Sequence, residues 1–389
     1  MEIMDYLRTM VETEASDLYL TVARPTMYRI DGKIRPIGDH VFKPEDLEAL
    51  AKSVMNDWQL KEFAETMEMN MATSLPGISR FRVNIFRQRG SVGMVIRQVK
   101  VEVATLEELG LPVVLRDITM RKRGLTLVVG ATGSGKSTTL AAMVDHRNAS
   151  EAGHIITIED PIEFDHRHKQ SIVTQREVGF DTTSFQAALK NTVRQAPDVI
   201  LIGEIRDTET MEAALTFAET GHLCLGTLHS NNANQAIERI MNFFPPERHT
   251  QIDLQLSLNL RSIIAQRLVP ALEGKRVAAL EILMDTPRIR DLIRRGEVET
   301  LKEGMEQGVQ EGCQTFDQSL FLLFKEGKIS LEQALINADS TNNLRLKIKL
   351  AGLKTNEDAE LVRQEDLRTG QSEPLQAANA FRLAKPRHR

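Results

Sequence analysis

The chain has 389 residues, and its 41% hydrophobic and 26% charged residues are a balance that supports a globular protein with a sizeable core. Its net charge of −5 gives no global basic field, so we expect no nucleic acid partner. Two distant cysteines, Cys224 and Cys313, suit a reducing compartment and leave no four-thiolate zinc site. No apolar run approaches the length of a membrane span or a signal peptide, so we expect a cytoplasmic protein without membrane insertion.

The first 98 residues predict an α+β domain of their own. The expected strands form two hairpins, which turn at Asp31-Gly32 and at Arg89-Gly90, with two helices between them. In chain order, the expected elements are helix 3–11, strands 17–22, 27–30 and 33–37, a helix from Pro44, a helix from Trp58 to Phe63, and strands 80–86 and 92–97.

A linker over 99–112 leads to a second region, 113–350, in which strands alternate with helices, a pattern typical of a parallel α/β sheet. The expected buried strands are 125–129, 155–158, 199–202 and 223–226. The last part of this region predicts helices 256–268, 287–295, 315–326 and 330–338, with a polar loop punctuated by Gly304, Gly308 and Gly312. Beyond Leu350 the apolar periodicity fades, so 351–389 predicts a disordered tail with a basic end.

The segment 130–137, GATGSGKS, fits the P-loop pattern G-x-x-x-x-G-K-[ST] between an apolar strand and a helix. Its glycines allow a tight turn that aims backbone N–H groups at a phosphate, and the positive end of the following helix dipole adds to the anion site. Lys136 would reach the β- and γ-phosphates of ATP, and the Ser137 hydroxyl would bind Mg²⁺. The predicted nucleotide-binding residues are Gly130, Ala131, Thr132, Gly133, Ser134, Gly135, Lys136, Ser137 and Thr138.

Acidic residues follow two other apolar strands. Glu204 ends the run 199–204, VILIGE, where a P-loop protein needs a carboxylate to organise Mg²⁺, although a buried strand ending in a solvated glutamate reads the same way. The cluster Glu159, Asp160 and Glu163 follows strand 155–158, and carboxylates at the carboxyl edge of a parallel sheet can polarise an attacking water. Together with the P-loop, these acids predict a hydrolase site.

Two histidines flank strand 223–228. His229 follows the strand and therefore reaches the carboxyl edge, where it is placed to sense the γ-phosphate. For His222 a structural hydrogen-bonding role and a functional role stay open, and no third ligand points to a metal site.

Four segments in this order resemble a known family: 130–138 (GATGSGKST), 156–164 (ITIEDPIEF), 199–207 (VILIGEIRD) and 221–233 (GHLCLGTLHSNNA). They resemble the Walker A, Asp, Walker B and His boxes of the secretion ATPases of type II secretion and type IV pili. Within that superfamily the chain resembles the pilus retraction ATPases of the PilT/PilU kind, because it has no tetracysteine insertion. Residues 288–295, RIRDLIRR, depart at three positions from the AIRNLIRE motif of retraction ATPases, which favours the accessory branch of that family.

The resemblance implies a homo-hexamer, or a mixed ring with a paralogous retraction ATPase, whose subunits join a PAS-like N-terminal domain to a RecA-like ATPase core. It implies ATP and Mg²⁺ as cofactors, Glu163 as the residue that activates water, and Glu204 in the Mg²⁺ shell. Arg80, Arg82 and Arg97 of the N-terminal hairpin would neutralise charge on the transferring phosphoryl group, or would be only cross-strand charges.

The family's cellular role is pilus retraction and twitching motility, with an inner-membrane pilus platform protein as partner and a peripheral place on that machine. Two other classes stay open. A nucleic-acid translocase can share the RecA-like ring, and a non-motor subunit can bind ATP and join a partner's ring.

Overall fold

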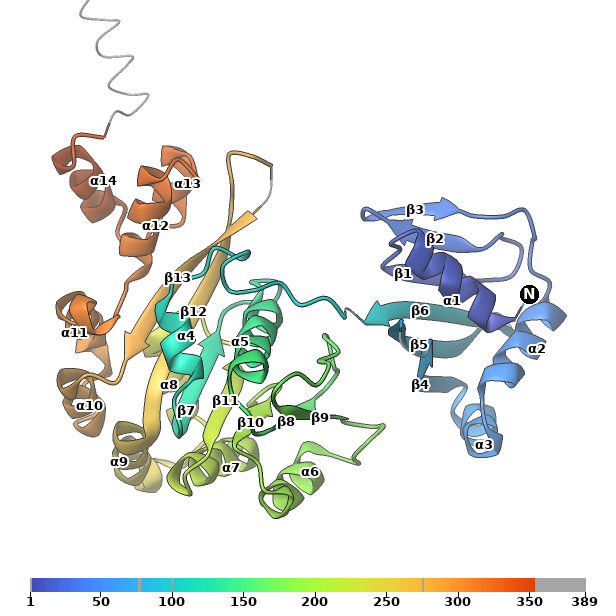
Figure 1. Ribbon diagram of the computed structural model, residues 1–389, viewed down its shortest axis with the longest axis horizontal. Coiled ribbons are helices and arrows are strands. Elements are labelled where there is room, and N and C mark those ends of the chain that lie inside the picture. The colour runs from blue at the N-terminus through green and yellow to red at the C-terminus, as the bar shows by residue number, and fades with distance from the viewer. Residues whose placement is uncertain (1, 76–77, 100, 275, 354–389) are drawn as a thin grey trace, which may run out of the picture.

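The structure is a computed structural model that describes residues 2–75, 78–99, 101–274 and 276–353. Its strands form two sheets, and the chain passes from the first sheet to the second after β6 (Figure 1). The expected tail lies outside the described residues from 354 onward. Within the described ranges, no helix combines the length and the apolar character needed to cross a bilayer.

The first sheet has six antiparallel strands in the order β3-β2-β1-β6-β5-β4. Alternate residues of β5 are buried, as its period-two pattern predicts, and they pack with the helices into a core of their own. The elements of this part are α1 (Ile3–Glu12), β1 (Asp17–Leu20), β2 (Met27–Ile30), β3 (Lys33–Pro36), α2 (Pro44–Val54), α3 (Asp57–Thr66), β4 (Glu68–Leu75), β5 (Ser79–Gln88) and β6 (Ser91–Val99).

The second sheet has seven strands in the order β13-β12-β7-β11-β10-β8-β9, all parallel except β13 at the edge. The elements up to β11 are α4 (Val114–Thr119), β7 (Gly124–Val129), α5 (Lys136–Ser150), β8 (His154–Glu159), β9 (Ile172–Glu177), α6 (Phe185–Thr192), β10 (Val199–Ile202), α7 (Thr208–Glu219) and β11 (Leu223–Leu228). They are followed by α8 (Ala233–Met241), α9 (His249–Asn259), β12 (Leu260–Pro270), β13 (Arg276–Met284), α10 (Pro287–Arg294), α11 (Leu301–Gln307), α12 (Phe316–Lys325), α13 (Leu331–Ile336) and α14 (Thr341–Leu350).

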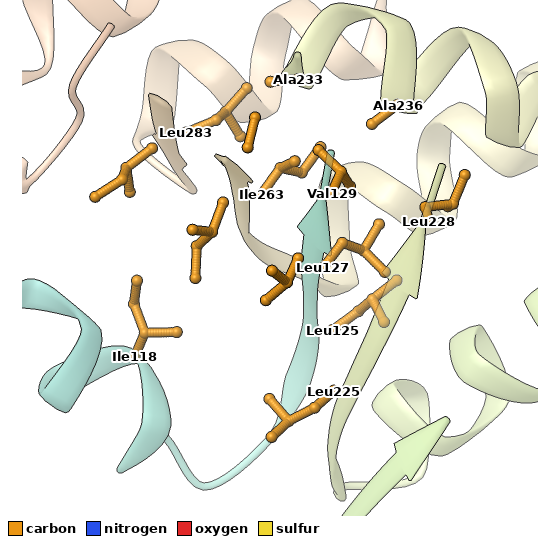
Figure 2. Close-up of a cluster of buried hydrophobic side chains, with 14 of the residues drawn as sticks. Ile118, Leu125, Leu127, Val129, Leu225, Leu228, Ala233, Ala236, Ile263 and Leu283 are labelled. Carbon is orange, nitrogen blue, oxygen red and sulfur yellow. The ribbon is translucent and has the colours of Figure 1, made fainter. Parts of the chain in front are cut away.

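The core of the second sheet is continuous and apolar. Every residue of β7 and of β11 is buried, which explains why these strands read as unbroken apolar runs rather than alternating ones. Figure 2 shows side chains of β7, among them Leu127 and Val129, packing beside Ile263 of β12 and Leu228 of β11. Helices α10 to α14 lie beyond β13, at the end of the sheet away from the N-terminal elements (Figure 1).

The predicted helix 256–268 is wrong. Helix α9 ends at Asn259, and Leu260 begins β12, which pairs in parallel with β7 on one side and antiparallel with β13 on the other. A strand buried on both faces has no period-two alternation, so its apolar run cannot be told from a buried helix by pattern alone.

The expected polar loop around Gly304 is also wrong. Gly304 lies inside α11, and a Cβ at this position would lie 2.8 Å from Ile289 Cδ1 of α10. Glycine is therefore used here for close helix packing rather than for a turn.

Candidate functional site

The order of strands in the second sheet gathers the predicted site at one edge. Strands β7, β11, β10 and β8 are consecutive neighbours and parallel, so their carboxyl ends lie side by side. The P-loop follows β7, His229 follows β11, Glu204 lies two positions after the end of β10, and the segment with Glu163 follows β8.

A cavity of about 330 Å³ opens at this edge. Its lining brings together groups that are far apart in the sequence, and among them are Lys136, Ser137, Glu163, Glu204 and His229. Seven of the predicted site residues therefore face one space: Thr132, Gly133, Lys136 and Ser137 from the P-loop, and Glu163, Glu204 and His229 from other strand ends.

The P-loop has the backbone that its glycines predict. Gly130, Gly133 and Gly135 have φ of +154°, +77° and +90°, values at which a side chain is strained. Among the described residues, no protein acceptor pairs the backbone N–H groups of Gly133 and Gly135, which remain available to an anion at the N-terminus of α5. The remaining residues of this segment form the turn into α5, with Ser137 and Thr138 in its first turn.

The Lys136 side chain folds back onto the P-loop. Its Nζ donates hydrogen bonds to the carbonyl oxygens of Gly130 at 2.8 Å and Ala131 at 3.0 Å. Burial lowers the pKa of Lys136, and the charge of Glu204 acts in the opposite direction. The ammonium is thus partly desolvated, a setting that strengthens its interaction with a phosphate.

Gln266 of β12, the strand that the sequence predicts as a helix, packs against the P-loop and the start of α5. Thr139 Oγ1 donates a buried 2.7 Å hydrogen bond to Gln266 Oε1. A Cβ on Gly135 would lie 2.7 Å from Gln266 Nε2, and one on Gly130 would lie 2.6 Å from the Gln266 carbonyl oxygen. The sequence does not point to Gln266, because the predicted helix 256–268 does not place this residue beside the P-loop.

Glu204 and His229 contact each other across neighbouring strand ends. His229 Nε2 lies 3.5 Å from Glu204 Oε1, and the two side chains are 44% and 36% exposed. His222 lies at the opposite end of β11, where its Nδ1 is 3.1 Å from Thr220 Oγ1, so it is remote from the cavity. The structure thus separates the two histidines that the sequence left as a pair.

Glu159, Asp160 and Glu163 all line the cavity, where Glu163 is exposed and Glu159 is half-buried. Burial raises the pKa of the Glu159 carboxyl, and hydrogen bonds from Thr157, Gln175 and the Glu163 backbone act against that shift. Asp160 forms an ion pair with Arg206 at 3.2 Å. The three acids of one cluster therefore have three different environments.

The N-terminal arginines do not line this cavity. Arg97 Nε donates to Asp17 Oδ1 at 2.8 Å, across the paired strands β1 and β6. Arg82 Nη2 donates to the carbonyl oxygen of Ile162 at 3.0 Å, and Arg80 Nη2 lies 3.9 Å from Glu177 Oε2. Arg82 therefore contacts the residue before Glu163, and Arg80 contacts Glu177 at the end of β9.

No group of three or more histidine, cysteine, aspartate or glutamate side chains in the described part of the chain is arranged to hold a metal ion. A magnesium ion in a P-loop site does not require such a group, since it is held by one or two protein oxygens, by waters and by phosphate. Ser137 and Glu204 line the same cavity and supply a hydroxyl and a carboxylate, so they fit that kind of site.

Comparison with known proteins identifies a family and two similar ATPases. Residues 2–364 match the family model described as Type II/IV secretion system protein. The chain is 54% identical over 351 residues to the type IV pilus ATPase PilU of Pseudomonas aeruginosa, covering 90% of this chain and 92% of that protein. It is 44% identical to the retraction ATPase PilT of the same organism, covering 88% of this chain and 100% of that protein.

A crystal structure of the pilus retraction motor PilT with bound ADP superposes on this chain with a TM-score of 0.82 at 43% identity. The match covers 89% of this chain and 99% of that one. The fold is thus confirmed as a RecA-like α/β core with an N-terminal PAS-like α+β domain.

The chain belongs to the Type II/IV secretion system protein family. Its resemblance to the PilT/PilU retraction ATPases is confirmed, and the chain is an ATPase of that kind.

Proposed function

We propose that this chain is a motor ATPase that couples ATP hydrolysis to the retraction of a type IV pilus and so to twitching motility. The observation that carries the proposal is the single cavity in which Lys136 and Ser137 face Glu163, Glu204 and His229. The names of its relatives support the cellular role: a pilus ATPase, a pilus retraction ATPase and a twitching motility protein of Neisseria gonorrhoeae.

Each group has a chemical role in hydrolysis. Lys136 binds the β- and γ-phosphates, and Ser137 and Glu204 would hold Mg²⁺, which would supply positive charge to the phosphates. Glu163 accepts the proton of the attacking water as a general base. His229 senses the γ-phosphate. Because His229 Nε2 lies 3.5 Å from Glu204 Oε1, a movement of the imidazole on phosphate binding also moves the Glu204 carboxylate.

Arg97 of the N-terminal hairpin, which is 63% exposed, supplies positive charge at the γ-phosphate when subunits assemble, whereas Arg80 and Arg82 are held by Glu177 within their own subunit. This role requires that nucleotide lies where one subunit meets its neighbour, so the working species is a hexamer or a mixed ring with a paralogous retraction ATPase. The higher identity to PilU than to PilT favours the accessory place in such a ring. The mass of the species in the presence of ATP, measured by light scattering, tests the ring.

The proposed division of the chain is an N-terminal domain over 1–98, a linker over 99–112, the ATPase core over 113–350 and a tail over 351–389. The ring would lie in the cytoplasm, peripheral to the inner membrane, on the platform protein of the pilus machine. No nucleic acid takes part in this function.

The test is steady-state ATP hydrolysis by the wild type, by Lys136→Ala and by the control Lys122→Ala, which removes an exposed lysine ahead of β7. Lys136→Ala should lower kcat/KM by about 10²–10³-fold, the usual cost of removing one charged group from a developing negative charge. The control should hydrolyse ATP at the wild-type rate. Equal rates in all three proteins would overturn the site, and stimulation by added paralogous retraction ATPase would support the mixed ring.

A further inference from the structure

Ile162, the residue before Glu163, is held at both of its backbone polar groups by side chains from other elements. Its N–H donates to Glu177 Oε2 at 3.3 Å, and its carbonyl oxygen accepts from Arg82 Nη2 at 3.0 Å. The two holding groups also contact each other, since Arg82 Nη2 lies 3.5 Å from Glu177 Oε2. Residues of β5 and β9 thus close a ring of contacts around the backbone of one residue.

Glu177 is the central member of this ring. It ends β9, and it is 2% exposed. Besides Arg82, its Oε2 lies 3.9 Å from Arg80 Nη2, and its own N–H donates to Asp181 Oδ2 at 2.9 Å. A carboxylate this far from water needs paired charge and hydrogen bonds, so removing either side leaves an uncompensated group.

Arg82 depends on the same contacts. Burial lowers the pKa of the Arg82 guanidinium, and the charges of Glu177 and then Glu163 act in the opposite direction. Its Nε is buried and has no hydrogen-bond partner among the described residues, so the contacts of Nη2 to Ile162 and Glu177 are what hold this cation. Arg82 of the N-terminal sheet and Glu177 of the core therefore compensate each other's buried charge.

The neighbouring strand repeats the arrangement one residue later. Glu159 and Glu177 are paired partners at the ends of β8 and β9. The backbone N–H of Glu163 lowers the pKa of the Glu159 carboxyl against the effect of burial, while Glu177 accepts a hydrogen bond from the Ile162 N–H at 3.3 Å. Two acids at the paired ends of β8 and β9 therefore act on two successive backbone N–H groups, and the buried Glu177 holds the first of them by a hydrogen bond, directly before the residue that carries the Glu163 side chain.

We propose that Glu177 is a positioning residue for ATP hydrolysis: through Ile162 and Arg82 it fixes the place of Glu163 and links that place to the N-terminal sheet. The inference rests on the proposed function, in which Glu163 is the general base. Glu177 does not line the nucleotide cavity, so its effect falls on the chemical step and not on ATP binding.

The test compares Glu177→Ala, Glu177→Gln and Arg82→Ala with the control Glu212→Ala, which removes the carboxylate of another arginine pair, Glu212 with Arg248, on α7. Glu177→Ala should lower kcat by about 10–100-fold, the scale of a displacement near 1 Å of a catalytic group, with KM for ATP within about threefold of wild type. Glu177→Gln should lose less, because its amide oxygen still accepts from Ile162. Glu212→Ala should match wild type in both constants.

Two readouts separate positioning from loss of folding. Hydrogen exchange followed by mass spectrometry should show the peptide over 160–164 exchanging at least about tenfold faster in folded Glu177→Ala, with β10 unchanged. Arg82→Ala added to Glu177→Ala should lower kcat no further, since both changes break one unit.

The outcomes distinguish the two proposals. A wild type that hydrolyses no ATP overturns the proposed function. A wild type that hydrolyses ATP, with kcat and exchange unchanged in a folded Glu177→Gln and Glu177→Ala, overturns only the positioning role. An increase in KM at constant kcat also overturns it, because that result places Glu177 in binding.

Discussion

Gly135→Ala should destabilise the core through two separable effects. Gly135 has φ of +90°, and a residue with a Cβ in this region costs about 1–2 kcal/mol. The new Cβ would also lie 2.7 Å from Gln266 Nε2, so the Gln266 side chain must move. That movement breaks the buried 2.7 Å hydrogen bond from Thr139, which costs about 1–3 kcal/mol.

Gly133→Ala is the matched control for the first effect. Gly133 has φ of +77°, and a Cβ there would meet no heavy atom within 4 Å. It should therefore cost only the conformational part, about 1–2 kcal/mol. Because 1 kcal/mol shifts Tm by about 2–4 °C in a unit of 150–250 residues, Gly135→Ala should melt about 2–12 °C below Gly133→Ala.

Differential scanning calorimetry of the three proteins without nucleotide measures this difference, and Gln266→Ala completes the cycle. In the Gln266→Ala background the Nε2 atom is gone, so Gly135→Ala should cost no more than Gly133→Ala. Equal Tm values for the two glycine variants in the wild-type background would refute the contact between Gly135 and Gln266.

The other predictions concern acidic residues. Glu163→Gln should bind ATP normally with little turnover, whereas Glu204→Gln should need more Mg²⁺ for half-maximal activity; ATP affinity and Mg²⁺ titrations of both decide, and the reverse pattern would exchange their roles. Burial raises the pKa of Glu281 to about 7, although the N–H of Ala233 donates to it at 2.8 Å. The folded state then binds a proton that the unfolded state releases between about pH 4.5 and 7, so Glu281 costs stability as pH rises through that window. Glu281→Gln should therefore raise Tm by several degrees at pH 8 and by little at pH 5, and a gain that is the same at both pH values would contradict the shift.

The nucleotide site was accessible from the sequence because each part is local. Nine consecutive residues, 130–138, form the P-loop, and each remaining group follows an apolar run by one or a few positions. Parallel pairing then places those strand ends together without any further information from the side chains. Glu163, Glu204 and His229 therefore meet Lys136 in one cavity, as their positions after strands predict.

Gln266 and Glu177 were missed for physical reasons that differ. Gln266 lies in β12, whose buried faces erase the alternation that marks a strand. Glu177 ends β9, an edge strand with the sequence IVTQRE, which has too few apolar residues to be recognised as a strand. Both residues act through contacts with distant elements, and the spacing of residues along one chain does not report such contacts.

The distribution of these contacts has a consequence for how a motor of this kind is controlled. Contacts from the N-terminal sheet reach Glu177 at the end of β9 through Arg80 and Arg82, and they reach Ile162, the residue before Glu163, through Arg82. The P-loop is supported instead from within the core by Gln266. If Glu177 acts as proposed, a displacement of the N-terminal sheet moves the general base while the phosphate-binding loop keeps its shape. Hydrolysis is then governed by the position of that sheet, and ATP binding is not.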